Sequence, residues 1–534
     1  MSDAAGHNES NHHDRRRTGA SAPAQHEAAH RVLPDIDFSR PSRPVSADPG
    51  PAAGHQADRP TDRNADISTS EPTSTAPALP RARSQTAGAL ASWPYAADAW
   101  RLSHRLSRRR IDFALRFRSA RAMPAAMRAR FTAMGLPDDV VDDTLARINR
   151  LDGWADAWIE TAQRYLGDFR RQVSAGNQID GARNQAMAAL CYHAAQIVTN
   201  PADDRTATMC RAASASLFTR ALPYVYPHAT RILFPWRAKS LPGYLHIPAD
   251  SQAGEHYGLI VILNGASSSK EESLTWSGPF VRRGFAVLAL DTPGTGEAAR
   301  APFSPDQDDL LDGVFDLLAA DRRLDLTQVF VTGVSLGGNT ALRCAAYDRR
   351  IAGVAAITAP VNPGRWIQRI SPLLADELLA LTNDQPSSVM ELAEALDLEA
   401  TLSRISCPVL VVGAGRDMIV PPTESQILAQ RLGPIATLDW FGDAGHCAYD
   451  HIGAWMADVA HWATALQEFT RSQAQPGRRR PSAEDAVAAA AFARDALRSL
   501  PPDEAPIEDE DFDGGARLLS DDEVLDDDPD WYAP

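Results

Sequence analysis

The segment Gly333-Val334-Ser335-Leu336-Gly337-Gly338 constrains the fold of this chain more than any other, and it directly follows the apolar run 328–332. A short apolar run rich in β-branched residues predicts a buried strand, and the residues after the segment favour a helix. A serine on a sharp turn brings neighbouring backbone close, so glycine is needed two positions before it and two positions after it. We therefore expect a strand, a strained turn that presents Ser335, and a helix.

Two later residues are suitable partners for such a serine. Asp417 follows the apolar run 409–412, and His446 follows Gly445 shortly before the last amphipathic segment, 451–470. A histidine can take the proton of a serine hydroxyl, and a carboxylate can hold that histidine in the right tautomer. The order Ser335, Asp417, His446 is that of α/β-hydrolases, so the sequence predicts a catalytic triad of these three residues.

Three other residues near the predicted triad have simpler interpretations. Asp443 is the alternative to Asp417, which we favour because it stands at a strand end. We interpret Glu424 as a helix-start residue. Cys447 follows His446 directly, and neighbours in sequence seldom form a catalytic pair, so we expect it to pack beneath the histidine loop.

A serine nucleophile also needs donors for the oxyanion that forms during acyl transfer. The backbone N–H of Leu336, just after the serine, is one candidate. The second should come from the loop that follows the apolar run 259–263, where we favour Ala266, with Gly265 permitting the close approach.

The order of patterns along the chain predicts four regions. Residues 1–88 are rich in Pro, Ser, Ala and charged residues and are expected to be disordered. Residues 89–227 are predicted to form an all-helical domain, with helices over 138–149, 153–175, 180–199 and 204–222. Residues 228–472 read as the catalytic domain. Residues 473–534 read as a linker, a stray helix over 483–500 and an acidic disordered tail.

Within 228–472, two hairpin strands over 230–235 and 241–247 precede six short apolar runs at 259–263, 285–290, 329–332, 354–357, 409–412 and 437–440. Such runs are typical of strands buried on both faces, and helical stretches separate most of them. We expect an α/β fold with a doubly wound, mostly parallel sheet.

Composition excludes several classes of function. No apolar run is long enough to span a membrane, and the N-terminus lacks a secretory signal. The five cysteines are scattered, without metal-ligand spacing, which fits free thiols in the cytoplasm.

Residues 501–534 hold 14 acidic residues and one arginine, so most of the net charge of −16 belongs to the tail. We expect no cofactor, no metal and no membrane.

The chain has two other segments for which we weighed a binding role. Residues 97–133 are rich in arginine but lack interleaved aromatics, so we favour a solvated helix face over a nucleic-acid site. The loop 291–297 has two glycines but matches neither a Walker loop nor a dinucleotide fingerprint, so we interpret it as a structural turn at the edge of the site.

Three segments together resemble a known group: 241–245 (LPGYL), 264–273 (NGASSSKEES) and 291–297 (DTPGTGE). With the Ser335 turn and the helical region, the chain resembles the α/β-hydrolases that include 2,6-dihydropseudooxynicotine hydrolase, the fermentation–respiration switch esterases and the fungal polyketide-shortening hydrolases. The similarity covers roughly residues 150–470.

The resemblance implies an α/β-hydrolase fold whose helical cap covers the site, so that the substrate lies between cap and sheet. It implies either ester hydrolysis or cleavage of a carbon–carbon bond beside a ketone. The segment that contains Lys270, Glu271 and Glu272 matches the family, and we interpret these three as structural. The candidates for substrate contacts in the cap are Trp154, Trp158, Tyr165, Tyr192 and His193, although cap aromatics also serve as core and His193 is expected to be structural. Among all candidates we favour Ser267, Trp158 and Tyr192.

We therefore expect a serine hydrolase that acts on a small or medium organic ester, lactone or β-diketone-type ketone, in specialised metabolism or catabolism. Its partner is a small-molecule substrate, and a homodimer is compatible with the sequence. Two alternatives stay open. The hydrolase could be an effector exported without a signal peptide through its N-terminal segment, or the fold could be a non-catalytic binding scaffold.

Overall fold

The computed structural model describes residues 108–123, 125–197, 204–249, 256–370, 372–382, 388–473 and 482–499. The N-terminal segment 1–88 and the acidic tail, both expected to be disordered, lie outside these residues. No helix in the described part of the chain is long and apolar enough to cross a membrane.

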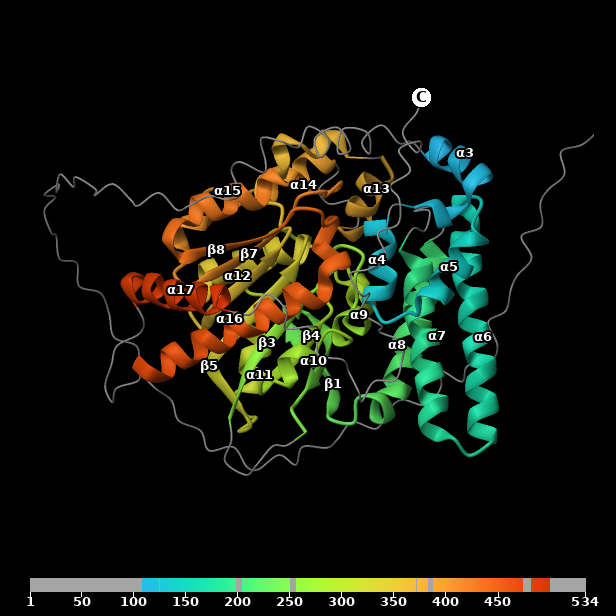
Figure 1. Cartoon of the computed structure of the whole chain (residues 1–534), viewed down its shortest axis with the longest axis horizontal. Helices are drawn as coiled ribbons and strands as arrows, with labels where there is room; N and C mark the ends of the chain where they lie inside the picture. Colours follow the sequence, from blue (N-terminus) through green and yellow to red (C-terminus); the bar gives the residue numbers. More distant parts are fainter. Residues whose placement is uncertain are drawn as a thin grey trace, which may run out of the picture. The chain divides into compact units, whose positions relative to one another are not determined.

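A sheet of eight strands forms the centre of the fold (Figure 1), in the order β1-β2-β4-β3-β5-β6-β7-β8. The strands β1 and β2 form an antiparallel hairpin, β2 pairs antiparallel with β4, and all other pairs are parallel. This confirms the expected mostly parallel sheet. Their bounds are β1 (Ala229–Trp236), β2 (Lys239–His246), β3 (Tyr257–Leu263), β4 (Phe285–Leu290), β5 (Leu324–Val334), β6 (Ile351–Ile357), β7 (Val409–Ala414) and β8 (Ala436–Phe441).

The central strands are buried on both faces, because helices cover the sheet from either side. Every residue of β3, β4 and β7 is buried. Alternate strand residues pack on α11 (Asp312–Leu318), α12 (Leu336–Tyr347) and α15 (Thr423–Leu432) on one face. The intervening residues pack on α10 (Gly278–Val281), α16 (Ile452–Gln473) and α17 (Ala483–Arg498) on the other. This two-sided burial explains why the strands lack alternation in the sequence.

The helical region before the sheet contains α3 (Arg108–Arg118), α4 (Ala125–Ala133), α5 (Asp138–Ala146), α6 (Trp154–Ser174), α7 (Gln178–Gln196) and α8 (Asp204–Val225). The arginine-rich segment thus forms two described helices, and the chain turns at Ser119, which has a positive φ of 56°. Aromatic rings of α4 and α6 form the core of this region, since Phe131 stacks on Trp158 with ring centroids 5.1 Å apart.

A second helical segment lies between β6 and β7, where the sequence analysis gave no bounds for a helix. It contains α13 (Pro372–Leu381) and α14 (Val389–Ala395). The loop that leads into it is held by Glu424 at the start of α15, whose Oε2 accepts hydrogen bonds from the backbone N–H groups of Val361 and Asn362, both at 2.7 Å. Glu424 is thus a helix-start residue, as expected, that also fixes this inserted segment.

Helix α17 is part of the hydrolase core and not the stray helix that the sequence analysis expected. Ala490 and Ala493 are fully buried, and the Phe492 ring packs on Phe469 of α16 with ring centroids 5.7 Å apart. Arg494 donates a hydrogen bond of 2.7 Å to the carbonyl of Ala436 at the start of β8. The helix therefore covers the β8 end of the sheet.

Replacing Ala493 with aspartate should lower the free energy of unfolding by about 3 kcal/mol, because a carboxylate would be buried without a partner. Ala491 lies two positions away on the exposed side of α17, so Ala491→Asp is the matched control and should cost far less. Urea unfolding of the two variants measures the difference. Equal losses would show that α17 does not pack as described.

Candidate active site

Ser335 occupies a strained turn between β5 and α12. Its φ of 52° lies in the left-handed region, and its side chain is half-buried between two buried neighbours. A Cβ on Gly333 would overlap the carbonyl of Gly337, and a Cβ on Gly337 would overlap the carbonyl of Leu263. The two glycines are therefore required by close backbone approach, as the sequence predicts.

His446 and Asp417 meet beside this turn. The Nδ1 atom of His446 lies 2.8 Å from Oδ2 of Asp417, whose carboxylate is buried. The other carboxylate oxygen accepts hydrogen bonds from the N–H groups of Ile419 and Val420 at 2.8 and 2.9 Å. Asp443, the alternative partner, instead points to His451, with Oδ1 3.2 Å from Nε2.

The backbone beneath His446 is strained. Cys447 and Ala448, in η9 (His446–His451), have φ values of 62° and 46°, and Thr358 at the end of β6 has a φ of 44°. The N–H of Cys447 donates to the Thr358 hydroxyl at 3.2 Å, and the Cys447 side chain is 2% exposed. Cys447 thus packs beneath the histidine loop, as expected. Strain of this kind persists where the surrounding structure holds a side chain in place.

The surroundings of His446 act on its charge in opposite directions. Burial by itself would lower the pKa of the imidazole, but the Asp417 carboxylate and the Cys447 sulfur raise that pKa above its ordinary value. The carboxylate therefore favours the imidazolium, the form that a histidine adopts after it takes a proton.

The loop 264–269 follows β3 and lies against the Ser335 turn. A Cβ on Gly265 would come within 3.2 Å of the carbonyl of Val334. In the described part of the chain, the backbone N–H groups of Ala266 and Leu336 have no acceptor, and both residues line the cavity above Ser335. Two unpaired donors at this place suit an oxyanion.

An ionic cluster, buried except for Glu297, lies at the end of this loop. The ammonium of Lys270, the first residue of α9 (Lys270–Leu274), lies 2.5 Å from Glu271, 3.0 Å from Asp291 and 2.7 Å from Glu297. Asp291 also accepts hydrogen bonds from the backbone N–H of Lys270 at 2.7 Å and from the side-chain amide of Asn264 at 3.0 Å. Burial would lower the pKa of Lys270, but Asp291 and Glu271 raise it, so the ammonium stays charged.

The loop 291–297 encloses the same cluster, as a structural turn at the edge of the cavity. Gly296 has a φ of 47°, and a Cβ there would overlap the Asp291 carboxylate. The N–H of Glu297 donates to that carboxylate at 2.9 Å. Gly296 is therefore required by the geometry of this turn.

A second set of polar side chains ties the loop to the helical region. Arg130 of α4 donates to the hydroxyl of Ser267 at 2.8 Å and to the carbonyl of Ser267 at 3.0 Å, and it lies 3.1 Å from the buried carboxylate of Glu272. His193 of α7 contacts the same carboxylate, with Nε2 2.8 Å from Oε2. Burial would raise the pKa of Glu272, but Arg130 and His193 lower it to about 2.

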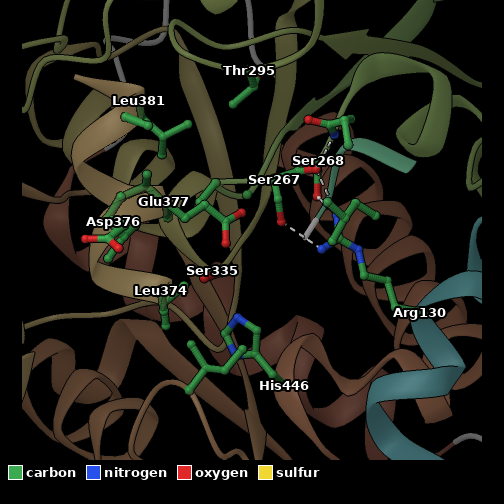
Figure 2. A pocket seen from close by; sticks show the side chains of 18 of the residues that line it. Arg130, Ser267, Ser268, Thr295, Ser335, Leu374, Asp376, Glu377, Leu381 and His446 are labelled. Atoms are coloured by element: carbon green, nitrogen blue, oxygen red, sulfur yellow. Dashed lines mark hydrogen bonds between the residues drawn. The ribbon is translucent and has the colours of Figure 1, made fainter. Parts of the chain in front are cut away.

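These elements enclose a cavity of about 1520 Å³ above Ser335 (Figure 2). Ser267, Ser335 and His446 face it, as does Glu377 of α13. Most of the remaining lining is apolar and comes from the helical region, the inserted segment and the loop after β7. It includes Ile111, Leu115, Met127, Phe131, Trp154, Ile367, Leu374, Leu378, Met418 and Ile419.

The prediction that Trp158 and Tyr192 contact the substrate is wrong for this cavity. Both side chains are fully buried, and neither lines it. Trp158 packs on Phe131 inside the helical region, and Trp154, one helical turn earlier, reaches the cavity instead. Aromatic residues at helical spacing here form the core, because α6 packs against α7 on that side.

Arg130 and Glu377 are the cavity residues that sequence reasoning missed. Arg130 belongs to an arginine-rich segment whose described members Arg110, Arg116, Arg118 and Arg121 are exposed, as expected. Its own side chain is only 15% exposed. The only sign of this in the sequence was that the apolar residues Phe131 and Ala133 lie within one helical turn of Arg130. The side chains from 108 to 499 that the structure describes contain no group of three His, Cys, Asp or Glu residues that could hold a metal ion.

A serine on the turn after the β5 strand, with a bonded aspartate and histidine at neighbouring strand ends, is the arrangement that α/β-hydrolases share. The chain belongs to this group: residues 260–526 match the alpha/beta hydrolase family, and residues 136–364 match the FrsA-like esterases. It is therefore a hydrolase of the α/β-hydrolase fold.

Among characterised relatives, 2,6-dihydropseudooxynicotine hydrolase of Paenarthrobacter nicotinovorans is 26% identical over 320 residues, which are 57% of this chain and 84% of the relative. Hydrolase LUC6 of a Fusarium species is 27% identical over 351 residues, 56% of this chain and 83% of that protein. The crystal structure of 2,6-dihydroxy-pseudo-oxynicotine hydrolase has a TM-score of 0.56 at 24% identity, and the match covers 63% of this chain and 94% of the chain in that structure. The structure of AbyA5 has a TM-score of 0.52 at 22% identity, and the match covers 68% of this chain and 94% of AbyA5. Both solved structures share the fold of this chain.

Replacing Glu272 with glutamine should destabilise the protein in a pH-dependent way. A carboxyl whose pKa falls from 4.5 to about 2 on folding stabilises the folded state by on the order of 3 kcal/mol at neutral pH. That contribution is present above the unfolded-state pKa and disappears as the pH falls from about 5 to about 2. The difference in unfolding free energy between wild type and Glu272→Gln should therefore shrink over this range.

Urea unfolding at a series of pH values measures this difference. The exposed residue Glu394 of α14 provides the control, because Glu394→Gln should change stability little at any of these pH values. A Glu272→Gln deficit that stays constant with pH would contradict the role of the Arg130–Glu272 pair.

Proposed function

We propose that this α/β-hydrolase acts through Ser335 as a nucleophile on the carbonyl group of a medium-sized, largely apolar ester, lactone or ketone. The observation that supports this most is the 2.8 Å contact between His446 and the buried Asp417, next to a serine on a strained turn in the same cavity. This is the constellation that serine nucleophiles need.

In the proposed mechanism, His446 takes the proton of the Ser335 hydroxyl while Ser335 Oγ bonds to the carbonyl carbon. Asp417 holds the imidazole by its Nδ1 atom and stabilises the imidazolium. The negative oxygen of the tetrahedral intermediate accepts hydrogen bonds from the backbone N–H groups of Ala266 and Leu336. After the leaving group departs with a proton, a water molecule activated by His446 releases the acyl group from Ser335.

The size and lining of the cavity indicate the class of substrate. Its volume of about 1520 Å³ exceeds the range of roughly 300–1,000 Å³ that is usual for small-molecule sites. Aliphatic and aromatic side chains from both helical segments form most of the wall. A relative named for its action on 2,6-dihydropseudooxynicotine supports an organic metabolite as substrate, and hence a role in catabolism or specialised metabolism.

Ser335→Ala should abolish covalent labelling by a fluorophosphonate probe, because the nucleophilic oxygen is removed. Ser267→Ala is the matched control: Ser267 also faces the cavity, but it has no contact with His446 and the variant should still be labelled. Intact-protein mass spectrometry reports the adduct. Equal labelling of wild type and Ser335→Ala would refute the assignment of the nucleophile.

Asp417→Asn should lower kcat by about 10³–10⁴-fold, because the imidazole loses the partner that holds its tautomer. It should also move the pH profile. His446 must be neutral to take a proton, and the Asp417 carboxylate raises its pKa, so wild-type activity should rise with pH through an alkaline-shifted limb. Without that charge, the limb should move to lower pH. Ester hydrolysis rates between about pH 5 and 10 test the direction of this shift.

A further inference from the structure

The inserted helix α13 contributes two carboxyl groups, Asp376 and Glu377, to the lining of the cavity that holds the proposed nucleophile. Glu377 lines the cavity together with Ser335, His446 and Ser267, and its side chain points inward from α13 (Figure 2). Its neighbour Asp376 is exposed. The proposed mechanism assigns no role to Glu377, because His446 already serves Ser335 as base.

Arg130 and Ser267 lie close enough to this carboxyl group to act on its charge. Arg130 Nη1 donates a hydrogen bond to the Ser267 hydroxyl at 2.8 Å. Arg130 itself is held by the buried Glu272. Figure 2 shows the Glu377 carboxyl group facing Ser267 of the loop 264–269.

The surroundings of Glu377 also favour its protonated form. Burial raises the pKa of its carboxyl to about 7, although Arg130 and Ser267 act to lower it. One face of the side chain stays open to the cavity. A carboxylic acid that keeps its proton near neutral pH can donate a hydrogen bond or a proton to a substrate oxygen.

We propose that Glu377 is a further catalytic residue, which donates a proton to the second oxygen of a β-diketone while the carbon–carbon bond next to the attacked carbonyl breaks. The inference rests on the proposed function of Ser335 and narrows its substrate class to ketones with a second oxygen in the 1,3 relation. Both Arg130 and Glu377 lie outside the residues 136–364 that match the FrsA-like esterases, so this arrangement does not follow from that similarity.

Ser335 Oγ bonds to one carbonyl carbon, and His446 takes the serine proton. When the tetrahedral intermediate collapses, the bond to the central carbon breaks and its electron pair forms an enolate. Glu377 gives its proton to the enolate oxygen, which yields an enol that becomes a methylene or methyl ketone. The proton on His446 passes through water to the Glu377 carboxylate, and His446 then activates the water that hydrolyses the acyl-serine.

An ester places its leaving oxygen elsewhere. The alkoxide departs from the carbon bonded to Ser335 Oγ, so it can take its proton from His446 directly. The two substrate classes therefore differ in their need for Glu377, and this difference distinguishes a proton donor from a residue that only supports the cavity.

Glu377→Gln, compared with wild type on benzoylacetone and longer 1,3-diketones and on phenyl butyrate, tests this inference. Glutamine keeps the size and a hydrogen-bond donor but has no acidic proton. We expect kcat for the diketones to fall by about 10²–10⁴-fold, while hydrolysis of the ester and labelling by a fluorophosphonate stay near the wild-type level. Glu394→Gln, at an exposed position of the neighbouring helix α14 that does not line the cavity, is the matched control and should retain both activities.

Three results would overturn the inference. Equal losses on both substrate classes would make Glu377 a structural residue, and no loss on the diketones would leave it without a role. A wild-type enzyme that hydrolyses phenyl butyrate but no 1,3-diketone would exclude the substrate class and leave the proposed nucleophile intact. If Ser335→Ala retains activity on both classes, the proposed function itself fails, which is a separate outcome.

Discussion

The loop 264–269 depends on buried charges on both of its sides, and the geometry of the candidate site depends on this loop. On the sheet side, Lys270 and Asp291 are fully buried and bonded to each other. On the cap side, Arg130 and Glu272 form a second buried pair. Breaking a buried pair leaves a charge without a partner, at a cost of about 3–5 kcal/mol. The backbone N–H of Ala266 is thus held between two networks that resist movement, as a preorganised oxyanion site requires.

The cavity is closed by two segments that are far apart in the sequence, and each brings one polar side chain to the same place. Helix α4, before the sheet, contributes Arg130, and helix α13, between β6 and β7, contributes Glu377. Both lie near Ser267, which accepts a hydrogen bond from Arg130. Most of the wall is apolar, so these groups and the other polar lining residues, such as Asp376 and Arg416, determine where a polar part of the substrate can lie. The enclosed volume favours a substrate larger than a simple acetate ester.

The sheet and the turn of Ser335 could be predicted from the sequence because their causes are local. Apolar runs, flanking glycines and the order of Ser335, Asp417 and His446 are sufficient. The residues that the analysis missed depend on tertiary contacts. Arg130 looks like its exposed neighbours until α4 packs against η9, and nothing near Glu377 indicates a cavity. Trp158 was misassigned because aromatic spacing on α6 does not reveal which side of the helix faces the substrate.

The crystal structure of the enzyme after reaction with a fluorophosphonate would test the central claim most directly. We expect phosphorus bonded to Ser335 Oγ, with the phosphoryl oxygen accepting hydrogen bonds from the N–H groups of Ala266 and Leu336 at about 2.7–3.1 Å. His446 should remain bonded to Asp417. Phosphorus on another side chain, or a phosphoryl oxygen directed away from both amides, would contradict the account.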